Sequence, residues 1–295
     1  MALPTSMAAY QRPENPPPRP PSGATTTTAP RDGAPQLTLI APQQHVGYAV
    51  NTQPTFTWFV PTETTVSGEF ALYEIIDEGA LATTVGASGT EMRTAETIAA
   101  GTTGEETTGR RPTVVEVLSE PHEFVSEPGF MSLDWSDEMP ELKPNTSYVW
   151  QVLLRYGDRP GEAVQMRAQI EILEADSYLP ALLSTDVSTQ VGQLAASGLW
   201  YDALTLAATL PAAESHAKRA ELLQNLAEIE LTEINMAEAA LTESLENSSP
   251  ASISETDVFR ERIRITHLRS NAQALSSIAS LEEEERLSSL LHRLH

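Results

Sequence analysis

The most regular pattern of apolar and polar positions lies between Leu142 and Val152. Residues suited to a buried face occupy every second position of this run and alternate with residues that are mostly polar. They are Leu142, Pro144, Thr146, Tyr148, Trp150 and Val152. A period of two predicts a strand with one buried face. A Pro-Asn turn precedes the Tyr-x-Trp strand, as at the corner between the sheets of an immunoglobulin-like or fibronectin-like sandwich. We therefore predict that the Tyr148 hydroxyl bonds back to the turn backbone.

Other short apolar runs bounded by turn residues predict further strands. They are Leu37–Ile40, Pro54–Pro61, Phe70–Ile76, Val114–Leu118, Gly129–Leu133 and Val164–Leu173. About seven strands with turn signals between them predict an antiparallel β-sandwich over residues 35–175. Residues 77–111 are rich in Gly, Thr, Ala and Glu without periodicity, which predicts an insertion loop in this domain.

After Asp176 the composition changes to Ala, Leu and Glu, and the pattern becomes helical. Within residues 176–248 we expect a helix capped by Asp186 and ended by Gly198, a second from Trp200 to Pro211, and two more over Glu214–Ile229 and Met236–Leu245. This punctuation is typical of one tetratricopeptide-like helical hairpin, and the copies are too few for a repeat array.

Residues 249–295 form a predicted long helical tail that begins at Thr256 and is interrupted near Ser280. Its apolar positions step by three and four: Ile265, Leu268, Ala272, Leu275 and Ala279. This seam is long enough to pack on the helical module or on a partner. At the other end of the chain, residues 1–34 are rich in Pro and Thr and poor in apolar side chains, which predicts a disordered tether.

The chain of 295 residues carries 18 Lys and Arg against 41 Asp and Glu, a formal charge of -23. Such a surface repels phosphate backbones and anionic lipids, so we expect neither nucleic acid nor a charged membrane surface as a partner. There is no cysteine, which excludes disulfides and thiolate chemistry and fits an exported protein. No apolar run reaches the roughly 18 residues that a membrane span requires.

Five short motifs follow one another in a fixed order: Gly33-Ala34-Pro35, Leu37 to Pro42, Pro54 to Pro61, Leu142 to Trp150, and Gly198 to Leu204. In this order they resemble the cyanobacterial domain-of-unknown-function family 928, over about residues 33 to 230. The resemblance implies an envelope or extracytoplasmic location, and it defines no catalytic residue. The chain departs from the family pattern before the first strand, in the long segment 77–111, and beyond about Asn235.

No catalytic motif is present, and we expect no enzyme activity, no cofactor and no metal site. The six histidines, His45, His122, His216, His267, His292 and His295, show no ligand spacing. One loop gathers the best candidates for binding, namely Asp134, Trp135, Asp137 and Glu138. Its acids lack calcium-loop spacing, so a solvated loop is the simpler interpretation. Burial of Trp135 is likewise favoured over exposure.

These observations predict a non-enzymatic interaction or scaffold protein of the cell envelope, exported to the periplasm or bound to the envelope, with the cytoplasm as the alternative. The sandwich would bind through its acidic loop or an edge strand, and the helical module would offer a groove to a partner helix. A protein partner is expected, and its identity and the oligomeric state stay open. Two alternatives are a carbohydrate-binding or carbohydrate-processing protein that uses Trp135 and its acidic neighbours, and a partner or sensor domain of a signalling system.

Overall fold

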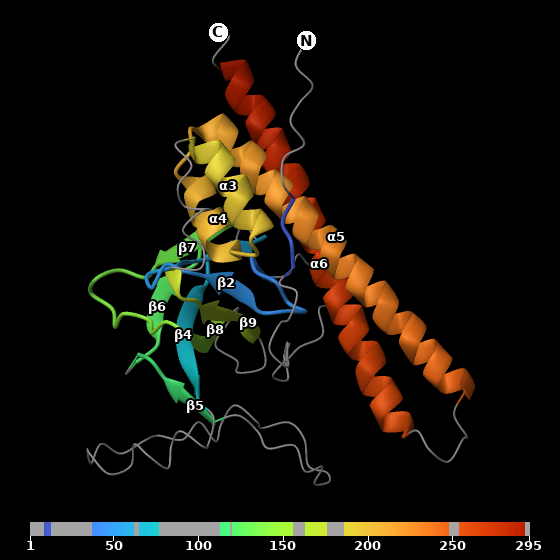
Figure 1. Ribbon diagram of the computed structural model, residues 1–295. Helices are drawn as coiled ribbons and strands as arrows, with labels where there is room; N and C mark the ends of the chain where they lie inside the picture. Colours follow the sequence, from blue (N-terminus) through green and yellow to red (C-terminus); the bar gives the residue numbers. More distant parts are fainter. Residues whose placement is uncertain are drawn as a thin grey trace, which may run out of the picture.

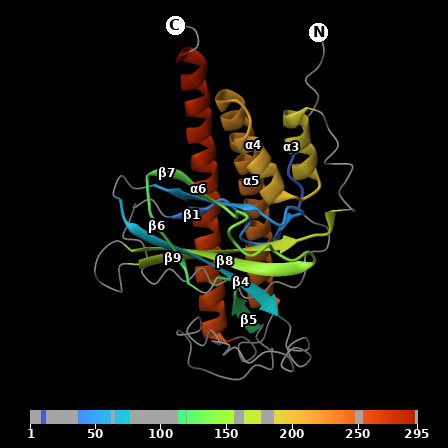
Figure 2. The ribbon, with the colours of Figure 1, turned by 90° about the vertical axis from the view of Figure 1, so that its left-hand side faces the viewer.

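The strands form two sheets (Figures 1 and 2). The computed structural model describes residues 9–12, 37–61, 65–76, 113–118, 120–155, 163–175, 186–247 and 254–292. The smaller sheet has the order β1 (Thr38–Leu39), β3 (Thr55–Val60) and β7 (Gly129–Asp134). The larger has the order β2 (Gly47–Ala49), β9 (Ala163–Ile172), β8 (Thr146–Arg155), β4 (Ser67–Ile76) and β5 (Thr113–Glu116), and β6 (His122–Val125) also pairs with β4.

All seven predicted strands are present, and β2 and β6 are additions to that set. Strands of three and four residues contain too few alternations to stand out from a loop. The expected antiparallel arrangement needs one correction, because β2 pairs in parallel with β9 and the larger sheet is therefore mixed. A parallel neighbour requires a long connection between the two strands, and nothing in the local pattern of β2 indicates its direction.

Aromatic side chains hold the two sheets together. Phe56 of β3 lies 5.0 Å from Phe70 of β4 and 5.3 Å from Trp150 of β8, measured between ring centroids. Trp58 of β3 stacks on Phe70. All four side chains are buried, as their inward positions on the strands predict. Contacts of this kind each add about 0.5–1.5 kcal/mol beyond the burial of their area.

The predicted tyrosine corner is confirmed. The backbone N–H of Lys143 donates to the Tyr148 hydroxyl at 2.8 Å, across the turn before β8. Asn145 takes a φ of 54°, a left-handed conformation that asparagine tolerates better than most residues. The run that shows the clearest alternation thus enters the larger sheet at its predicted position.

Four helices are present in the described residues: α3 (Val187–Ala196), α4 (Trp200–Ala208), α5 (Ala212–Asn247) and α6 (Glu255–His292). The Asp186 carboxylate accepts from the Thr189 backbone N–H at 2.7 Å and caps α3 as predicted. Gly198 takes a φ of 78° between α3 and α4, which a residue with a Cβ adopts only at a cost. The prediction of two helices over residues 214–245 is wrong, because α5 continues through them, and α6 likewise continues through Ser280.

One hydrophobic core joins the strands to the helices, so the predicted sandwich and helical module share their interior. Helices α3 and α4 lie between the sheets and the upper part of the α5–α6 hairpin (Figure 1). Of the predicted tether, only residues 9–12 are described, and they are packed against the helices. For these four residues a disordered tether is the wrong description. The rest of it, and the insertion loop at 77–111, lie outside the described residues.

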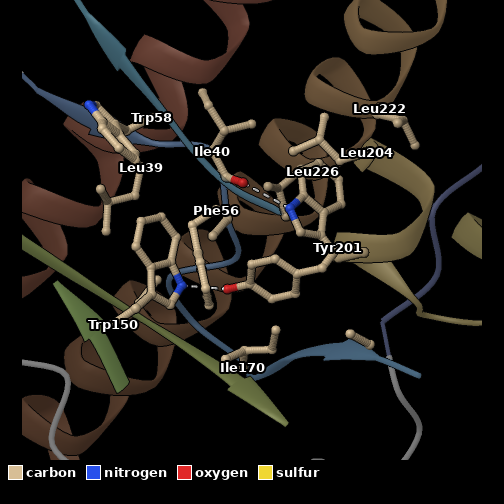
Figure 3. Close-up of a cluster of buried hydrophobic side chains, with 14 of the residues drawn as sticks. Leu39, Ile40, Phe56, Trp58, Trp150, Ile170, Tyr201, Leu204, Leu222 and Leu226 are labelled. Atoms are coloured by element: carbon tan, nitrogen blue, oxygen red, sulfur yellow. Dashed lines mark hydrogen bonds between the residues drawn. The ribbon is translucent and has the colours of Figure 1, made fainter. Parts of the chain in front are cut away.

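Three consecutive residues at the start of α4 attach the helices to the sheets. The Trp200 indole N–H donates to the Ile40 carbonyl at 2.9 Å. The Tyr201 hydroxyl accepts from the Trp150 indole N–H at 2.7 Å, as Figure 3 shows, and donates to the Gln169 carbonyl at 2.9 Å. The following carboxylate, that of Asp202, accepts from the backbone N–H groups of Val50 at 2.8 Å and Asn51 at 3.2 Å.

The Tyr201 ring lies directly on β2. A Cβ added to Gly47 would stand 2.7 Å from Cε2 of that ring, a distance that forces one of them to move. Glycine is therefore required at this point for close approach and not for its backbone freedom. Tyr201 and Trp200 are both essentially without exposure, so their polar atoms depend on the bonds described here.

We predict that Tyr201→Phe lowers the free energy of unfolding by about 1–3 kcal/mol, because it leaves the buried Trp150 N–H without its acceptor. Tyr148→Phe is the control, since it removes one hydroxyl from an equally buried ring at the corner, where the hydroxyl bonds to the Lys143 N–H and to Thr146 and takes no part in the junction. Urea denaturation of both variants measures the difference. An effect of Tyr201→Phe no larger than that of Tyr148→Phe would contradict this account of the junction.

Candidate interaction surface

One half of the α5–α6 hairpin extends away from the sheets and from α3 and α4 (Figure 1). This free half consists of residues 231–247 of α5 and residues 255–272 of α6. With 36 and 38 residues at 1.5 Å each, the two helices are about 54 and 57 Å long. A small separate core holds this half together, formed by Ile234, Ile265 and Ala272 with Leu231, Ala237, Leu241 and Leu268 around them. In the described parts of the two helices, no residue between Ile234 and Ile265 is buried. The end of the hairpin is thus supported by helix-to-helix contact alone.

Large apolar side chains are exposed on this free half. Phe259 is 65% exposed and Ile263 is 42% exposed. Four residues apart on one helix, they lie on the same face of α6. Met236 and Leu245 of α5 are exposed as well. Single exposed apolar residues are common, whereas Phe259 and Ile263 form an adjacent exposed pair.

Where the hairpin meets the rest of the molecule, Glu230 of α5 is completely buried. Its carboxylate accepts from the Gln43 backbone N–H at 2.5 Å and lies 3.5 Å from the Asn271 amide nitrogen of α6. Its backbone carbonyl accepts from the Gln44 side chain at 2.8 Å. Burial raises the pKa of Glu230 to about 8, although these donors and Asn271 oppose the shift. The carboxyl is therefore largely protonated at neutral pH.

Residues 9–12 lie between α3 and α5 as an extended segment with three attachments. The Tyr10 hydroxyl shares a hydrogen bond of 2.9 Å with Nε2 of His45. The Gln11 backbone N–H donates to the Ala195 carbonyl at the end of α3, at 3.1 Å. Arg12 forms an ion pair with Glu233 of α5. Tyr10 is 3% exposed, so the segment places a whole aromatic ring in the core.

An open groove of about 370 Å³ runs beside this segment along α5. Its lining consists of Ala9, Tyr10, Asn225, Glu228, Ile229, Thr232, Glu233 and Met236. His45, which contacts Tyr10, is buried, and its Nδ1 has no hydrogen-bond partner among the described residues. Burial, with Arg12 nearby, lowers the pKa of His45 to about 4, which keeps the imidazole neutral at physiological pH.

A second polar cluster connects both long helices to the smaller sheet. Glu282 of α6 is 3% exposed, and its carboxylate accepts from Nε of Arg219 at 2.8 Å and lies 3.0 Å from Nδ1 of His216. The Arg219 guanidinium lies 5.0 Å from the centre of the Phe130 ring on β7. The cluster supplies a buried carboxylate with a counter-charge, so its chemistry is that of a structural ion pair.

The predicted binding loop is arranged differently from a ligand site. Trp135 is 2% exposed, packs edge-on against Phe56, and donates its indole N–H to the Pro140 carbonyl at 2.7 Å. Asp134 accepts from the Thr55 hydroxyl at 2.8 Å, and Asp137 accepts from the Gln53 amide at 2.6 Å. These acids attach the loop to the smaller sheet and the turn before it. Glu138 is exposed. The expected burial of Trp135 is confirmed, and a ring in the core offers no face for stacking on a sugar.

Sequence reasoning missed Tyr10, His45 and Glu230 as members of one region. Tyr10 is the single aromatic residue of positions 1–34, and an isolated aromatic in a Pro- and Thr-rich stretch is a signal for an anchor. Glu230 continues the apolar stripe of Leu223 and Leu226, so its place on the seam was also visible. Their proximity was not, because Glu230 lies more than 180 positions after the other two and Tyr10 lies 35 positions before His45.

Comparison with known proteins gives one family match. Residues 107–240 match the family model described as Domain of Unknown Function (DUF928), in agreement with the predicted resemblance. The match includes the tyrosine corner and the start of α4, and the motifs before residue 62 lie outside it. No curated protein and no solved structure matches the chain. In the part of the chain that the structure describes, no helix combines the length and the apolar character that crossing a bilayer requires.

The raised pKa of Glu230 makes a prediction about stability. The folded protein keeps a proton on this carboxyl up to about pH 8, whereas the unfolded chain loses it near its ordinary pKa of 4.5. The folded state therefore binds more protons between these values, and stability falls as pH rises through this window. Relative to Glu230→Gln, the wild type should lose on the order of 3 kcal/mol of unfolding free energy between pH 5 and 8.

Urea denaturation of the wild type and of Glu230→Gln at several pH values tests this expectation. Burial also shifts the pKa values of His45 and Asp202, and both groups are present in both proteins, so their effect on the pH dependence cancels in the difference. Glu243→Gln, at an exposed position of the same helix, is the control and should follow the wild type. A constant difference between wild type and Glu230→Gln across the range would refute the prediction.

Proposed function

We propose that this chain, which carries a domain of the DUF928 family over residues 107–240, is a non-enzymatic interaction protein of the cell envelope. One observation carries the proposal: the α5–α6 hairpin projects from the body and exposes Phe259 and Ile263 on one face near its free end. The sheets, with α3 and α4, would serve as the rigid base that orients this hairpin.

Two features support a display architecture of the kind expected from the sequence. The Lys143–Tyr148 bond is the corner interaction of immunoglobulin-like sandwiches, and the parallel β2–β9 pair is a departure from them. Helices α3 and α4, separated by Gly198, keep the punctuation of a tetratricopeptide-like hairpin. Many different sites can be built on such frameworks, so the interaction role is argued from the exposed pair on the hairpin and not from the fold.

The charge and the composition restrict the class of molecule that the chain can bind. A formal charge of -23 argues against nucleic acid and favours another protein. The family resemblance and the lack of cysteine support export to the periplasm or envelope. A role as a partner domain in signalling would use the same surface, and identification of the bound protein would distinguish the two.

The test is a cross-linked pull-down from native extract with the full-length protein and two variants. Phe259→Ser with Ile263→Ser removes the exposed pair, and Val125→Ser removes an apolar side chain on β6 that is 63% exposed. We expect a stoichiometric protein to be retained by wild type and by Val125→Ser, and at least about tenfold less by the double variant, because buried apolar anchors dominate interface energies.

Both sets of substitutions are at exposed positions, so thermal melting should show stabilities within about 0.5 kcal/mol per site of the wild type. Equal retention by the double variant and the wild type would exclude the hairpin as the binding surface. Loss of retention in Val125→Ser alone would place the interaction on the edge of the larger sheet instead.

A further inference from the structure

Residues 9–12 are bound to the molecule in the way that a short linear peptide is bound by a receptor. Tyr10 is a buried anchor, the Gln11 backbone N–H donates to Ala195, and Arg12 pairs with Glu233. An aromatic anchor, a backbone hydrogen bond and a charge contact on successive residues are the recurring elements of peptide recognition.

The pocket for Tyr10 is specific for a phenol. The ring meets Trp200 edge-on at 5.0 Å and lies against His45 with ring centroids 6.0 Å apart. The hydroxyl reaches Nε2 of His45 at 2.9 Å, in a region where the imidazole is 6% exposed. A phenylalanine would fill the same space but leave the buried Nε2 without this partner, and that loss is unfavourable.

The surface around the segment extends further than the segment itself. The groove of about 370 Å³ follows α5 from Asn225 to Met236, and Ala9 and Tyr10 form part of its wall. Carboxylates of Glu228 and Glu233 line it, and Glu233 pairs with Arg12. Such a groove favours a basic residue near the aromatic anchor and offers contact area to neighbouring residues of a longer peptide.

The covalent connection allows exchange. Residues 13–36 stand between the segment and the described part that resumes at Leu37, and 24 residues can span up to about 80 Å when extended. Because the segment and its pocket belong to one chain, the segment occupies the pocket as an intramolecular ligand. A free peptide therefore competes with the chain's own segment, and an abundant or tighter-binding one replaces it.

We propose that the cleft between α3 and α5 is a recognition site for extended protein segments of the form Tyr-x-Arg, and that residues 9–12 occupy it until a partner with such a segment displaces them. The partner is thus a protein with an exposed tyrosine and an arginine two residues later. This site is separate from Phe259 and Ile263 on the hairpin, so a test of one site does not decide the other.

The first test uses the full-length protein with Tyr10→Ala and Arg12→Ala, which empties the site while keeping the chain. A fluorescein-labelled peptide with the sequence of residues 6–16 is titrated and followed by anisotropy. We expect saturable 1:1 binding, and binding at least about tenfold weaker to the wild type, whose own segment competes. The far-UV circular dichroism spectrum of the variant must match that of the wild type.

Peptide and receptor variants locate the binding. A peptide with Tyr10→Ala should bind at least about tenfold more weakly, and one with Tyr10→Phe about fivefold more weakly, since each factor of ten corresponds to 1.4 kcal/mol. Glu233→Gln in the receptor should weaken the binding of the Arg-containing peptide about threefold. Glu243→Gln, on the same helix outside the groove, is the matched control and should change nothing.

A second measurement avoids the large truncation at Tyr10. A protease site is inserted between Thr25 and Thr26 of the otherwise native chain, and the purified protein is cleaved after folding. We expect the released N-terminal fragment to dissociate on dilution and to exchange with labelled peptide while the body keeps its spectrum. Three results would each overturn the proposal. The first is that neither folded receptor binds the peptide saturably, and the second is that the Tyr10→Ala peptide binds as tightly as the native one. The third is that the body unfolds when the fragment leaves.

Discussion

The arrangement of the molecule depends on one set of buried hydrogen bonds at the start of α4. Trp200, Tyr201 and Asp202 reach three different parts of the sheets from consecutive positions. Consecutive helical residues point about 100° apart, so the three bonds can form together in one orientation of α4. Because an unpaired polar group in this core is costly, the bonds select that orientation over others with similar apolar contact.

Glu230 imposes a second constraint on the long hairpin. It stands at a seam position of α5 and needs the Gln43 backbone N–H, so it aligns the hairpin with the loop between β1 and β2. Beyond this point α5 still pairs with Arg12 through Glu233, and a small core around Ile234 and Ile265 joins the two helices. The molecule therefore has a firmly attached part and a projecting part. The groove for Tyr10 lies at the boundary between them.

The candidate surfaces were predictable to different degrees. The acids around Trp135 are conspicuous in the sequence, yet Asp134 and Asp137 bond to neighbouring parts of the chain and the tryptophan is in the core. Tyr10 is the reverse case. It is a lone aromatic residue in a stretch whose composition predicts disorder, and yet it is buried. Composition describes the average tendency of a segment, and a single anchor residue can be bound in a preformed pocket despite its neighbours.

The sequence by itself determined the elements whose signals are local: the period-two strand from Thr146 to Arg155, the tyrosine corner, the cap at Asp186, and the family of residues 107–240. Only the tertiary structure decided the continuity of α5, the parallel direction of β2 and the burial of Tyr10. In each of these cases the deciding group comes from a distant part of the chain. Gln43 supplies a donor to Glu230 across 187 positions, and the periodicity of one segment carries no information about such a partner.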